Sequence, residues 1–334
     1  MTLAIALLMG LILGFSAHRA GICTVKAVAE VLTSRRAYFL ISFAKTGLWV
    51  IAVTMLAGMF SVEAGFRHWP LTGFSVLGGV LFGMGAGVNR GCTFSTVSRL
   101  MDGNLNLAAT VLGWPVGLWL GLQFWARIAT PPVAVSAGPG PAFFSFLGLL
   151  VTLFVAWEIC VLFLSLWRKA PLRRILGARN YTLTAAAALL GLSNGVLLLV
   201  SGPWSFTGTL LCGLDAGGLA RCDDPALPWL ILLAALTGMV ISALQRGSFH
   251  WRLPRLHLVA QHGGAGVLMG FGAVLVPGGN DGLILFGLPS LSPHALPAYG
   301  GILLGILMVL LGMRFFGGSV PPIKCDGDIC RSEI

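Results

Sequence analysis

Two cysteines occupy matching sequence contexts in the first third of the chain. The stretch from Gly10 reads GLILGFSAHRAGICT and the stretch from Gly79 reads GVLFGMGAGVNRGCT, so Cys23 and Cys92 each follow an arginine and a glycine. A thiol beside a cation and a helix N-terminus can offer a polar S–H group to an anion. Cysteine is also a small residue that is often buried, but two thiols at equivalent positions favour a functional role.

The arginines of the same two stretches indicate the charge of a ligand. Arg19 and Arg90 are both predicted inside apolar segments, where an unpaired cation is costly and usually lines a cavity or meets a charged partner. We therefore expect both to attract an anion. The alternative is that they reach the membrane surface or pair with Glu30 or Asp102.

Both stretches belong to a unit that recurs along the chain. Superposing the first two copies places Gly21 on Gly91 and the two arginines on each other. A third copy, GVLMGFGAVLVPGGND, starts at Gly266, and a weaker fourth, GLSNGVLLLVSGPWS, covers residues 191–205. Each copy reads as a helix interrupted by Gly or Pro, which must face protein or a wet cavity because lipid cannot satisfy its freed backbone groups. The glycines also suit close helix packing.

The composition is that of an integral membrane protein. The 334 residues are 57% hydrophobic and only 10% charged, with a mean hydropathy of +0.90. Soluble proteins carry about 25% charged residues, and several apolar runs here reach the roughly 20 residues that cross a bilayer. The formal net charge of +10 has a topological explanation and does not indicate nucleic-acid binding.

The apolar runs and the repeats together predict an all-α polytopic membrane protein with about nine spans in a single transport domain, residues 1–334. The first half, 1–127, and the second half, 181–316, each contain two repeat units, and residues 317–334 form a tail. The expected spans are four broken, re-entrant helices at 1–32, 73–100, 181–213 and 262–290, four intact helices at 38–60, 104–127, 227–245 and 297–316, and one odd linking span at 143–167.

The distribution of basic residues predicts the orientation. With the N-terminus outside and the tail in the cytoplasm, 14 of the 21 Lys and Arg residues fall in inside segments and three fall in outside segments. This asymmetry follows the positive-inside rule and places residues 168–179 inside and 131–141 outside. Because one linking span lies between the two halves, their broken helices cross the membrane in opposite directions, and the halves form an inverted repeat. This architecture places substrate sites near the midplane at the helix breaks.

These features resemble the YeeE/YedE family of sulphur-compound transporters over nearly the whole chain, on the strength of HRAGICT, NRGCT and the four-unit organisation. The resemblance implies a bacterial inner-membrane protein in which cysteine thiols pass thiosulfate, or a related small sulphur anion, along a central path. It also implies a cytoplasmic sulphur-carrier protein as a possible partner. The path residues of the first two units are Arg19, Gly21, Cys23, Thr24, Arg90, Gly91, Cys92 and Thr93.

The last unit departs from the family's pattern. Where thiosulfate-type members read Gly-Gly-Cys-Thr, this chain reads Gly-Gly-Asn280-Asp281. Asn280 can still offer N–H donors to an oxyanion. An ionised Asp281 repels an anion, so this residue could be protonated, paired with Lys26 or Arg19, coupled to a cation, or used as a helix cap. We place both residues in the expected path, which needs no metal and no cofactor.

Two kinds of residue outside the path carry weaker signals. Glu158 lies within the odd span, with Cys160 two residues on, and could be a proton-coupling carboxylate or a hydrogen-bonded packing residue. His18 and His262 lie near span ends and suit structural roles better than metal binding, since neither has a second histidine at helical spacing.

The remaining cysteines fall into two pairs. Cys212 and Cys222 border a loop predicted to lie outside, where an oxidising periplasm permits a disulfide. Cys325 and Cys330 in the tail could bind a metal or meet a thiol partner, although a structural zinc site usually has four ligands.

Three functions remain open on the sequence. The leading hypothesis is a transporter of a small sulphur-containing anion, and a selective anion channel needs the same sequence features. A membrane thiol oxidoreductase needs a closely spaced cysteine pair, whereas Cys23 and Cys92 belong to different units. The chain has no phosphate-binding Gly-x-x-x-x-Gly-Lys-Ser/Thr motif, which argues against ATP-driven transport by this chain alone. We therefore expect a transporter and not an enzyme.

Overall fold

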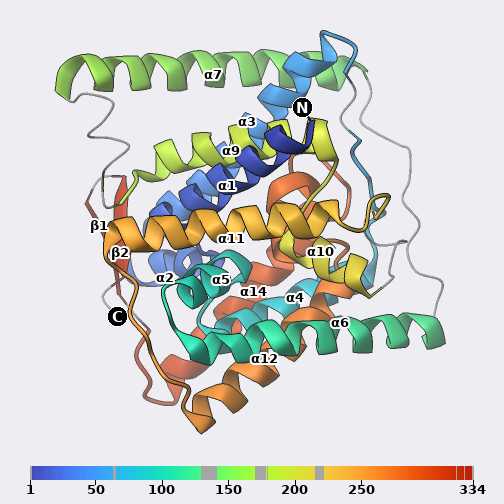
Figure 1. Ribbon diagram of the computed structural model, residues 1–334, viewed down its shortest axis with the longest axis vertical. Helices are drawn as coiled ribbons and strands as arrows, with labels where there is room; N and C mark the ends of the chain where they lie inside the picture. The colour runs from blue at the N-terminus through green and yellow to red at the C-terminus, as the bar shows by residue number, and fades with distance from the viewer. Residues whose placement is uncertain are drawn as a thin grey trace.

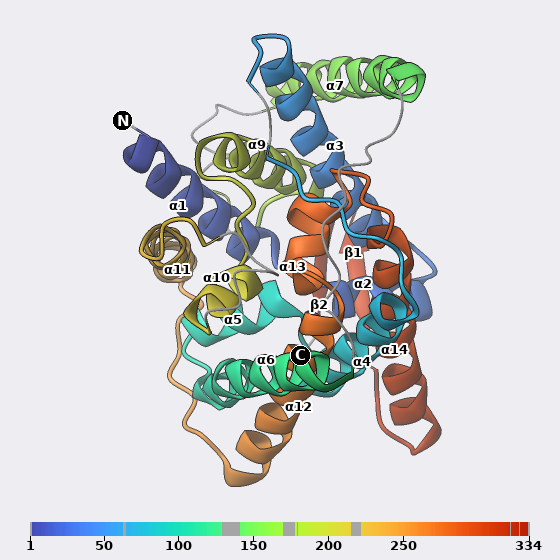
Figure 2. The same ribbon diagram turned by 90° about the vertical axis from the view of Figure 1, so that its right-hand side faces the viewer.

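A computed structural model describes residues 2–62, 65–128, 141–169, 178, 180–214, 222–320, 322–326 and 328–332. Within these ranges, long helices run along a common direction and enclose several short ones (Figures 1 and 2). The long helices are mostly apolar and about 20 residues long, which corresponds to about 30 Å of helix and matches the hydrocarbon thickness of a bilayer.

Each predicted repeat unit consists of a long helix, a short helical segment and a second long helix. Unit 1 contains α1 (Thr2–Ala20), α2 (Thr24–Ser34) and α3 (Tyr38–Gly58), and unit 2 contains α4 (Gly73–Asn89), α5 (Thr93–Met101), the turn η1 (Leu105–Leu107) and α6 (Ala108–Ile128). Unit 3 contains α9 (Leu183–Ser201), α10 (Phe206–Gly213) and α11 (Leu227–Arg246), and unit 4 contains α12 (Leu256–Leu275), α13 (Gly279–Gly282), the π-helical turn η2 (Leu283–Gly287) and α14 (Ala295–Phe315).

Among the described residues, seven helical segments are long and apolar enough to cross a membrane. They confirm a polytopic membrane protein, and the count of nine spans stays a prediction. The two expected spans outside this set are unit 2's α4–α5 and the odd helix α7 (Pro141–Lys169), which has a shorter apolar stretch at Phe146–Val161. The seven segments are Thr2–Ser34, Tyr38–Gly58, Leu105–Arg127, Leu183–Gly213, Leu227–Arg246, Leu256–Leu275 and Ala295–Phe315.

The units pack as two equivalent pairs. Unit 1 packs on unit 3 through α1 against α11 and α3 against α9, and unit 2 packs on unit 4 through α4 against α14 and α6 against α12. In both pairs the first long helix of one unit lies against the last long helix of the other. The first helices of paired units also touch, α1 against α9 and α4 against α12. The same contact pattern therefore occurs twice.

Glycines allow these helices to approach closely. A Cβ on Gly14 would collide with the backbone of Ala235 on α11, and a Cβ on Gly83 would collide with the backbone of Ile302 on α14. The predicted Gly-x-x-x-Gly packing is therefore present at both interfaces. Gly270 makes the same kind of contact on α12, against the backbone of Trp114. Van der Waals packing across small residues is one of the forces that drive helix association in a bilayer.

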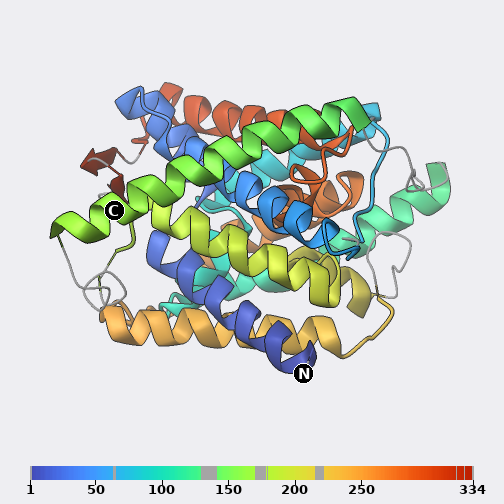
Figure 3. The ribbon, with the colours of Figure 1, turned by 90° about the horizontal axis from the view of Figure 1, so that it is seen from above.

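Two elements lie at the edge of the bundle. Helix α7 crosses one side of the molecule, where it packs on α3 (Figure 3). The tail forms a hairpin of two short strands, β1 (Ile323–Asp326) and β2 (Ile329–Ser332), which the all-α prediction omitted. Most of residues 131–141 and 168–179, the loops whose sides the charge count predicts, lie outside the described residues.

The hairpin and α10 lie toward opposite ends of the bundle (Figure 1). Helix α11 connects these regions: it begins at Leu227, five residues after Cys222, and ends at Arg246. We refer to the two ends as the α10 end and the hairpin end.

Candidate functional site

The first two helix breaks have the same backbone geometry. Helix α1 ends at Ala20, and Gly21 turns the chain with a φ of 59° before Cys23 begins α2. In unit 2 the left-handed residue is Arg90, with a φ of 55°, and Cys92 begins α5. Such a φ is uncommon for a residue with a side chain. The structure therefore matches Arg90 with Gly21, two residues before each cysteine, and corrects the superposition of Arg90 on Arg19.

The two cysteines meet in the centre of the protein. Both side chains are fully buried, and the two thiols lie beside each other. The backbone N–H of Thr24, the first residue of α2, donates to Cys92 Sγ at 3.4 Å. Neither cysteine caps its own helix with its side chain. The positive N-terminal ends of α2 and α5 therefore lie beside two thiols, an arrangement that favours a negatively charged ligand.

Unit 4 brings an amide to the same place. Gly278 and Gly279 both have positive φ, 97° and 62°, and turn the chain after α12. Asn280 follows and is fully buried, and its Oδ1 accepts a hydrogen bond from Thr24 Oγ1 at 3.2 Å. The predicted path residues Cys23, Cys92, Thr24 and Asn280 are therefore brought together from three different units.

Asp281 joins unit 3, the remaining unit, to this cluster. Its carboxylate accepts hydrogen bonds from Thr207 N at 2.9 Å and from Thr207 Oγ1 at 2.7 Å, in the first turn of α10. The carboxylate is thus held by a helix N-terminus, and not by Lys26 or Arg19. Lys26 Nζ donates to Gly21 O at 3.2 Å. Of the roles left open for Asp281, the geometry fits that of a helix cap, although the helix belongs to unit 3.

Three polar atoms near the thiols have no hydrogen-bond partner among the described residues. They are Thr93 Oγ1, Asn280 Nδ2 and the hydroxyl of Tyr299 on α14, which lies next to Thr24 and both cysteines. All three side chains are buried. An unsatisfied buried polar group costs about 1–3 kcal/mol, so these atoms are available to a ligand that can accept hydrogen bonds. We call Cys23, Cys92, Thr93, Asn280 and Tyr299 the central cluster.

A basic cavity lies between the central cluster and the hairpin end. It has a volume of about 280 Å³ and contains Gly21 at the break of unit 1. Its charged and titratable lining residues are His18, Lys26, Arg90, Arg99, Asp102, Arg246 and Arg252. Five cations against one carboxylate make this cavity attractive to anions.

The one carboxylate in this cavity is firmly held. Asp102 Oδ1 accepts hydrogen bonds from Ser248 Oγ at 2.6 Å and His18 Nε2 at 3.0 Å. Burial alone raises the pKa of Asp102, but the hydrogen bonds from His18 and Ser248 outweigh it, so the pKa lies below its usual value of 3.8. Asp102 is therefore ionised at neutral pH and ties α5 to α1 and to the loop after α11.

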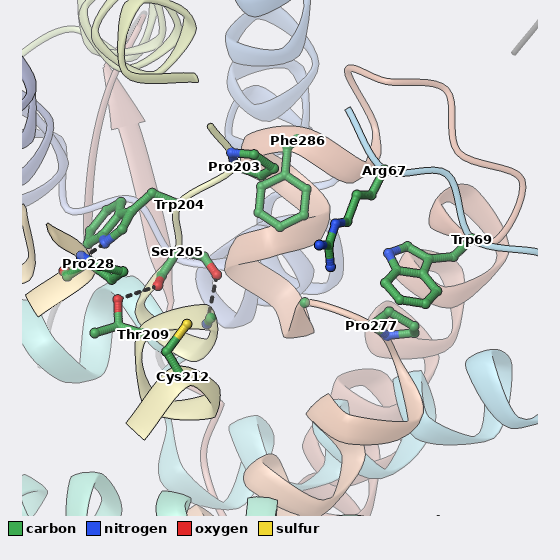
Figure 4. Close-up of a pocket in the computed structure, with 12 residues that line it drawn as sticks. Arg67, Trp69, Pro203, Trp204, Ser205, Thr209, Cys212, Pro228, Pro277 and Phe286 are labelled. Atoms are coloured by element: carbon green, nitrogen blue, oxygen red, sulfur yellow. Dashed lines mark hydrogen bonds between the residues drawn. The ribbon is translucent and has the colours of Figure 1, made fainter. Parts of the chain in front are cut away.

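A smaller cavity of about 30 Å³ lies on the other side of the central cluster, toward the α10 end (Figure 4). Ser205 begins α10 there: its Oγ accepts from Gly208 N at 2.9 Å, and its carbonyl oxygen accepts from Thr209 Oγ1 at 3.0 Å. Arg67 supplies a cation, and the aromatic lining comes from Trp69, Trp204 and Phe286. Gly278, two residues before Asn280, also lines this cavity.

The two predicted arginines have different places. Arg90 is exposed and lines the basic cavity. Arg19 is buried and turns toward α11, where it donates to Ser242 Oγ at 3.1 Å and Gln245 Oε1 at 2.7 Å, as well as to the carbonyl of Ala178. All three nitrogens of Arg19 are therefore used within the protein. These contacts hold Arg19 against α11, and its role in the anion path stays a prediction. Neither arginine is paired with Glu30 or Asp102.

The weaker candidates outside the path have protein partners. Glu158 Oε1 lies 2.7 Å from Lys45 Nζ, an ion pair that ties α7 to α3 and favours the packing role. His18 binds Asp102 and Ser242, and His262 Nδ1 lies 2.8 Å from Asn89 Oδ1. Both histidines therefore have the structural roles that their isolation in the sequence indicated.

Four of the remaining cysteines form disulfides. Cys212–Cys222 is bridged as the sequence allowed, and Cys325–Cys330 closes the tail hairpin, where the sequence suggested a metal or a thiol partner. Glu30 lies beside the second bridge, with its Oε1 3.4 Å from Cys325 Sγ. Cys160 is free and exposed.

Tyr299 and Thr207 were not singled out from the sequence. Tyr299 is a lone polar aromatic in an apolar span, which is a weak signal by itself. Thr207 lies just beyond the break of the weakest repeat, Ser201-Gly-Pro-Trp-Ser205. The sequence identified this unit, but it did not indicate the contact between Thr207 and Asp281. Both contacts join elements far apart in the chain, which a sequence pattern does not reveal.

Comparisons with known proteins agree with this architecture. A family model described as sulphur transport matches residues 19–308. The chain is also similar to the thiosulfate transporter TsuA of Spirochaeta thermophila, with 26% identity over 319 residues, covering 86% of this chain and 91% of that protein. These matches identify a transporter and not an enzyme. The chain belongs to the sulphur transport family, the YeeE/YedE family that its cysteine motifs resemble.

Proposed function

We propose that this protein carries a small sulphur-containing anion, thiosulfate or a close relative, across the bacterial inner membrane through the central cluster. The observation that carries the proposal is the meeting of two thiols with unpartnered hydroxyl and amide groups between two cation-lined cavities. Thiosulfate has a soft sulphur at one end and three oxygens at the other. The thiols suit the first end, and the N–H and O–H donors suit the second.

The proposed route runs from the α10 end to the hairpin end. Arg67 attracts the anion at the α10 end, the thiols of Cys23 and Cys92 pass it on by transient S–H···S contacts, and the basic cavity receives it. The positive-inside asymmetry supports a cytoplasmic hairpin end, where a sulphur-carrier protein collects the anion. The repeated packing pattern supports nine spans arranged as an inverted repeat, with the four breaks as re-entrant tips.

The central cluster is closed in this structure, which favours gated passage over an open channel. Cys23, Cys92 and Asn280 are each 0% exposed. No continuous water path therefore joins the two cavities through these residues. Transport then requires a movement that exposes the thiols to one cavity at a time, as in alternating access.

The test is uptake of labelled anions into proteoliposomes. We expect thiosulfate to enter faster than sulfate, which lacks a soft terminal sulphur. Cys23→Ala and Cys92→Ala should each lower thiosulfate uptake at least about tenfold, as loss of a ligand contact worth about 1.4 kcal/mol requires. Cys160→Ala is the matched control and should transport normally, because this cysteine lies outside the cluster. Normal uptake by a double Cys23/Cys92 variant would reduce both cysteines to packing residues.

A further inference from the structure

The tail hairpin is attached to both halves of the protein. On the first half, the carbonyl of Ile323 accepts a hydrogen bond from Ser34 Oγ, and its N–H donates to Thr33 Oγ1 at 3.4 Å, at the end of α2. On the second half, Asp328 receives the first N–H groups of α9: Leu183 N donates to its carbonyl at 2.8 Å and Thr184 N to its carboxylate at 2.8 Å. The hairpin therefore straps unit 1 to unit 3.

The strap also borders the basic cavity. Ile323 is buried and is one of the cavity's lining residues. Two residues further along, Cys325 pairs with Cys330 across the two strands. Cys325 Sγ lies 3.4 Å from Glu30, a buried carboxylate that accepts the N–H groups of Tyr38 and Phe39 at 3.0 Å and so caps α3. The disulfide thus closes a strap that contacts α2 and α9 at one mouth of the route and lies beside the carboxylate that caps α3.

The two disulfides of this chain lie at opposite ends of the membrane-spanning bundle. Cys212 lines the cavity at the α10 end together with Pro228, near the start of α11. Ile323 of the hairpin lines the basic cavity together with Arg246, the last residue of α11. Helix α11 has 20 residues, which is about 30 Å of helix and one bilayer thickness. In a membrane, one of the two disulfides must therefore face the cytoplasm, whichever way the protein is inserted.

The cytoplasm keeps most protein thiols reduced, so a disulfide there is usually transient or redox-sensing. We infer that the Cys325–Cys330 pair is a reversible thiol–disulfide exchange site that controls the strap, an inference that rests on the proposed orientation with the hairpin end inside. A cytoplasmic dithiol protein is the reductant. One of its thiolates attacks a sulphur of the disulfide to form a mixed disulfide, and its second thiol then displaces the remaining cysteine.

This exchange balances in atoms and electrons. The Cys325–Cys330 bond breaks, two thiols form in the hairpin, and the reductant's two thiols become one disulfide, so two electrons and two protons move to the hairpin. The reduced hairpin has lost its cross-link and holds α2 and α9 less firmly. The oxidised strap hinders the relative movement of units 1 and 3 that opens the basic cavity, and the reduced strap permits it.

The redox state can be measured in cells without any transport assay. Growing cells are quenched in acid, denatured, and labelled with a maleimide polymer that adds a fixed mass to each free thiol. The parent should carry two labels more than the double variant Cys325→Ser/Cys330→Ser. It should carry the same number as the matched control Cys212→Ser/Cys222→Ser, because the bridge at the α10 end stays oxidised. Equal labelling of the parent and the hairpin variant would refute the exchange site.

The coupling to transport is measured in proteoliposomes with an impermeant phosphine reductant on the hairpin side. Thiosulfate uptake by the parent should rise about threefold or more, the factor expected when a helix loses one cap, and uptake by the hairpin double variant should not respond. Asp328→Ala should raise uptake without reductant. Asp224→Ala removes a comparable cap from α11 at the opposite end and should leave the redox response unchanged.

If thiosulfate uptake by the parent does not respond to the reductant, the disulfide does not control transport through the strap. The number of maleimide labels does not depend on uptake, so it shows whether Cys325 and Cys330 are reduced in cells even if no anion is transported. Failure of the proposed function and failure of this inference are therefore distinguishable.

Discussion

Removal of the Tyr299 hydroxyl should show whether this group serves ligand binding or folding. Tyr299→Phe removes a single oxygen atom and keeps the ring, so no cavity opens around this buried side chain. In the empty protein the hydroxyl has no hydrogen-bond partner among the described residues, although it lies next to Thr24 and the two cysteines. If its role is to bind the anion, its loss harms only the occupied state.

The magnitude follows from the energies of hydrogen bonds. A hydrogen bond to a charged group contributes about 1.5–3 kcal/mol, and every 1.4 kcal/mol is tenfold in affinity. Tyr299→Phe should therefore weaken thiosulfate binding by about 10- to 100-fold. The melting temperature of the empty protein should stay constant or rise, because an unsatisfied buried hydroxyl is destabilising.

The assay pairs thiosulfate titration with thermal unfolding in detergent, in the absence and presence of the anion. The parent should be stabilised by thiosulfate, and Tyr299→Phe should need a correspondingly higher concentration for the same shift. Tyr38→Phe, on α3 and outside the central cluster, is the matched control and should bind like the parent. A variant with a lowered melting temperature and unchanged thiosulfate affinity would show that the hydroxyl supports the fold and not the ligand.

Three further outcomes follow from contacts described above. Gly83→Ala should sharply reduce the yield of folded protein because its Cβ meets the backbone of α14, whereas Gly300→Ala, with nothing within 4 Å, should fold normally; size-exclusion profiles in detergent compare the two. Asp281→Ala should destabilise the protein by about 1–3 kcal/mol in thermal unfolding because Thr207 loses its acceptor, while Asp281→Asn should retain most of the stability, and equal stability of both variants would exclude the cap. Asp102 has a lowered pKa, so its stabilising contribution is present above pH 3.8 and is lost as the pH falls below it. Asp102→Asn should therefore lower the melting temperature at neutral pH and flatten the acid side of the plot of melting temperature against pH. Parallel plots for the parent and the variant would contradict this.

Much of the architecture could be predicted because it depends on local patterns. The interruption of each repeat by Gly or Pro indicated four breaks, and the structure has helix ends at Gly21, Arg90, Gly202 and Gly278. The boundaries were less accurate: α12 begins at residue 256, six residues before the expected 262. Helix ends depend on capping and tertiary contacts that a hydropathy pattern does not contain.

The difference between the places of Arg19 and Arg90 has a specific physical cause. Both arginines precede a cysteine, but the spacing to the cysteine is four residues in unit 1 and two in unit 2. On a helix, two residues change the direction of a side chain by about 200°. Arg19 is therefore still on α1 and faces α11, whereas Arg90 forms the left-handed turn itself and faces the basic cavity.

The substitution in unit 4 makes the centre of the protein electrostatically uneven. Asp281 occupies the N-terminus of α10 with its own carboxylate, so the positive end of that helix is already neutralised. The N-termini of α2 and α5 are bordered by thiols and carry no acidic cap. In the proposed path, an anion in the centre would therefore be attracted toward Cys23 and Cys92 and away from unit 3. Asn280 lies at the boundary, where its Nδ2 can donate to the anion while its Oδ1 is held by Thr24. In the proposed path, an amide in this position would orient an oxyanion against the thiols without adding charge, which is a role that a third thiol cannot fill as well.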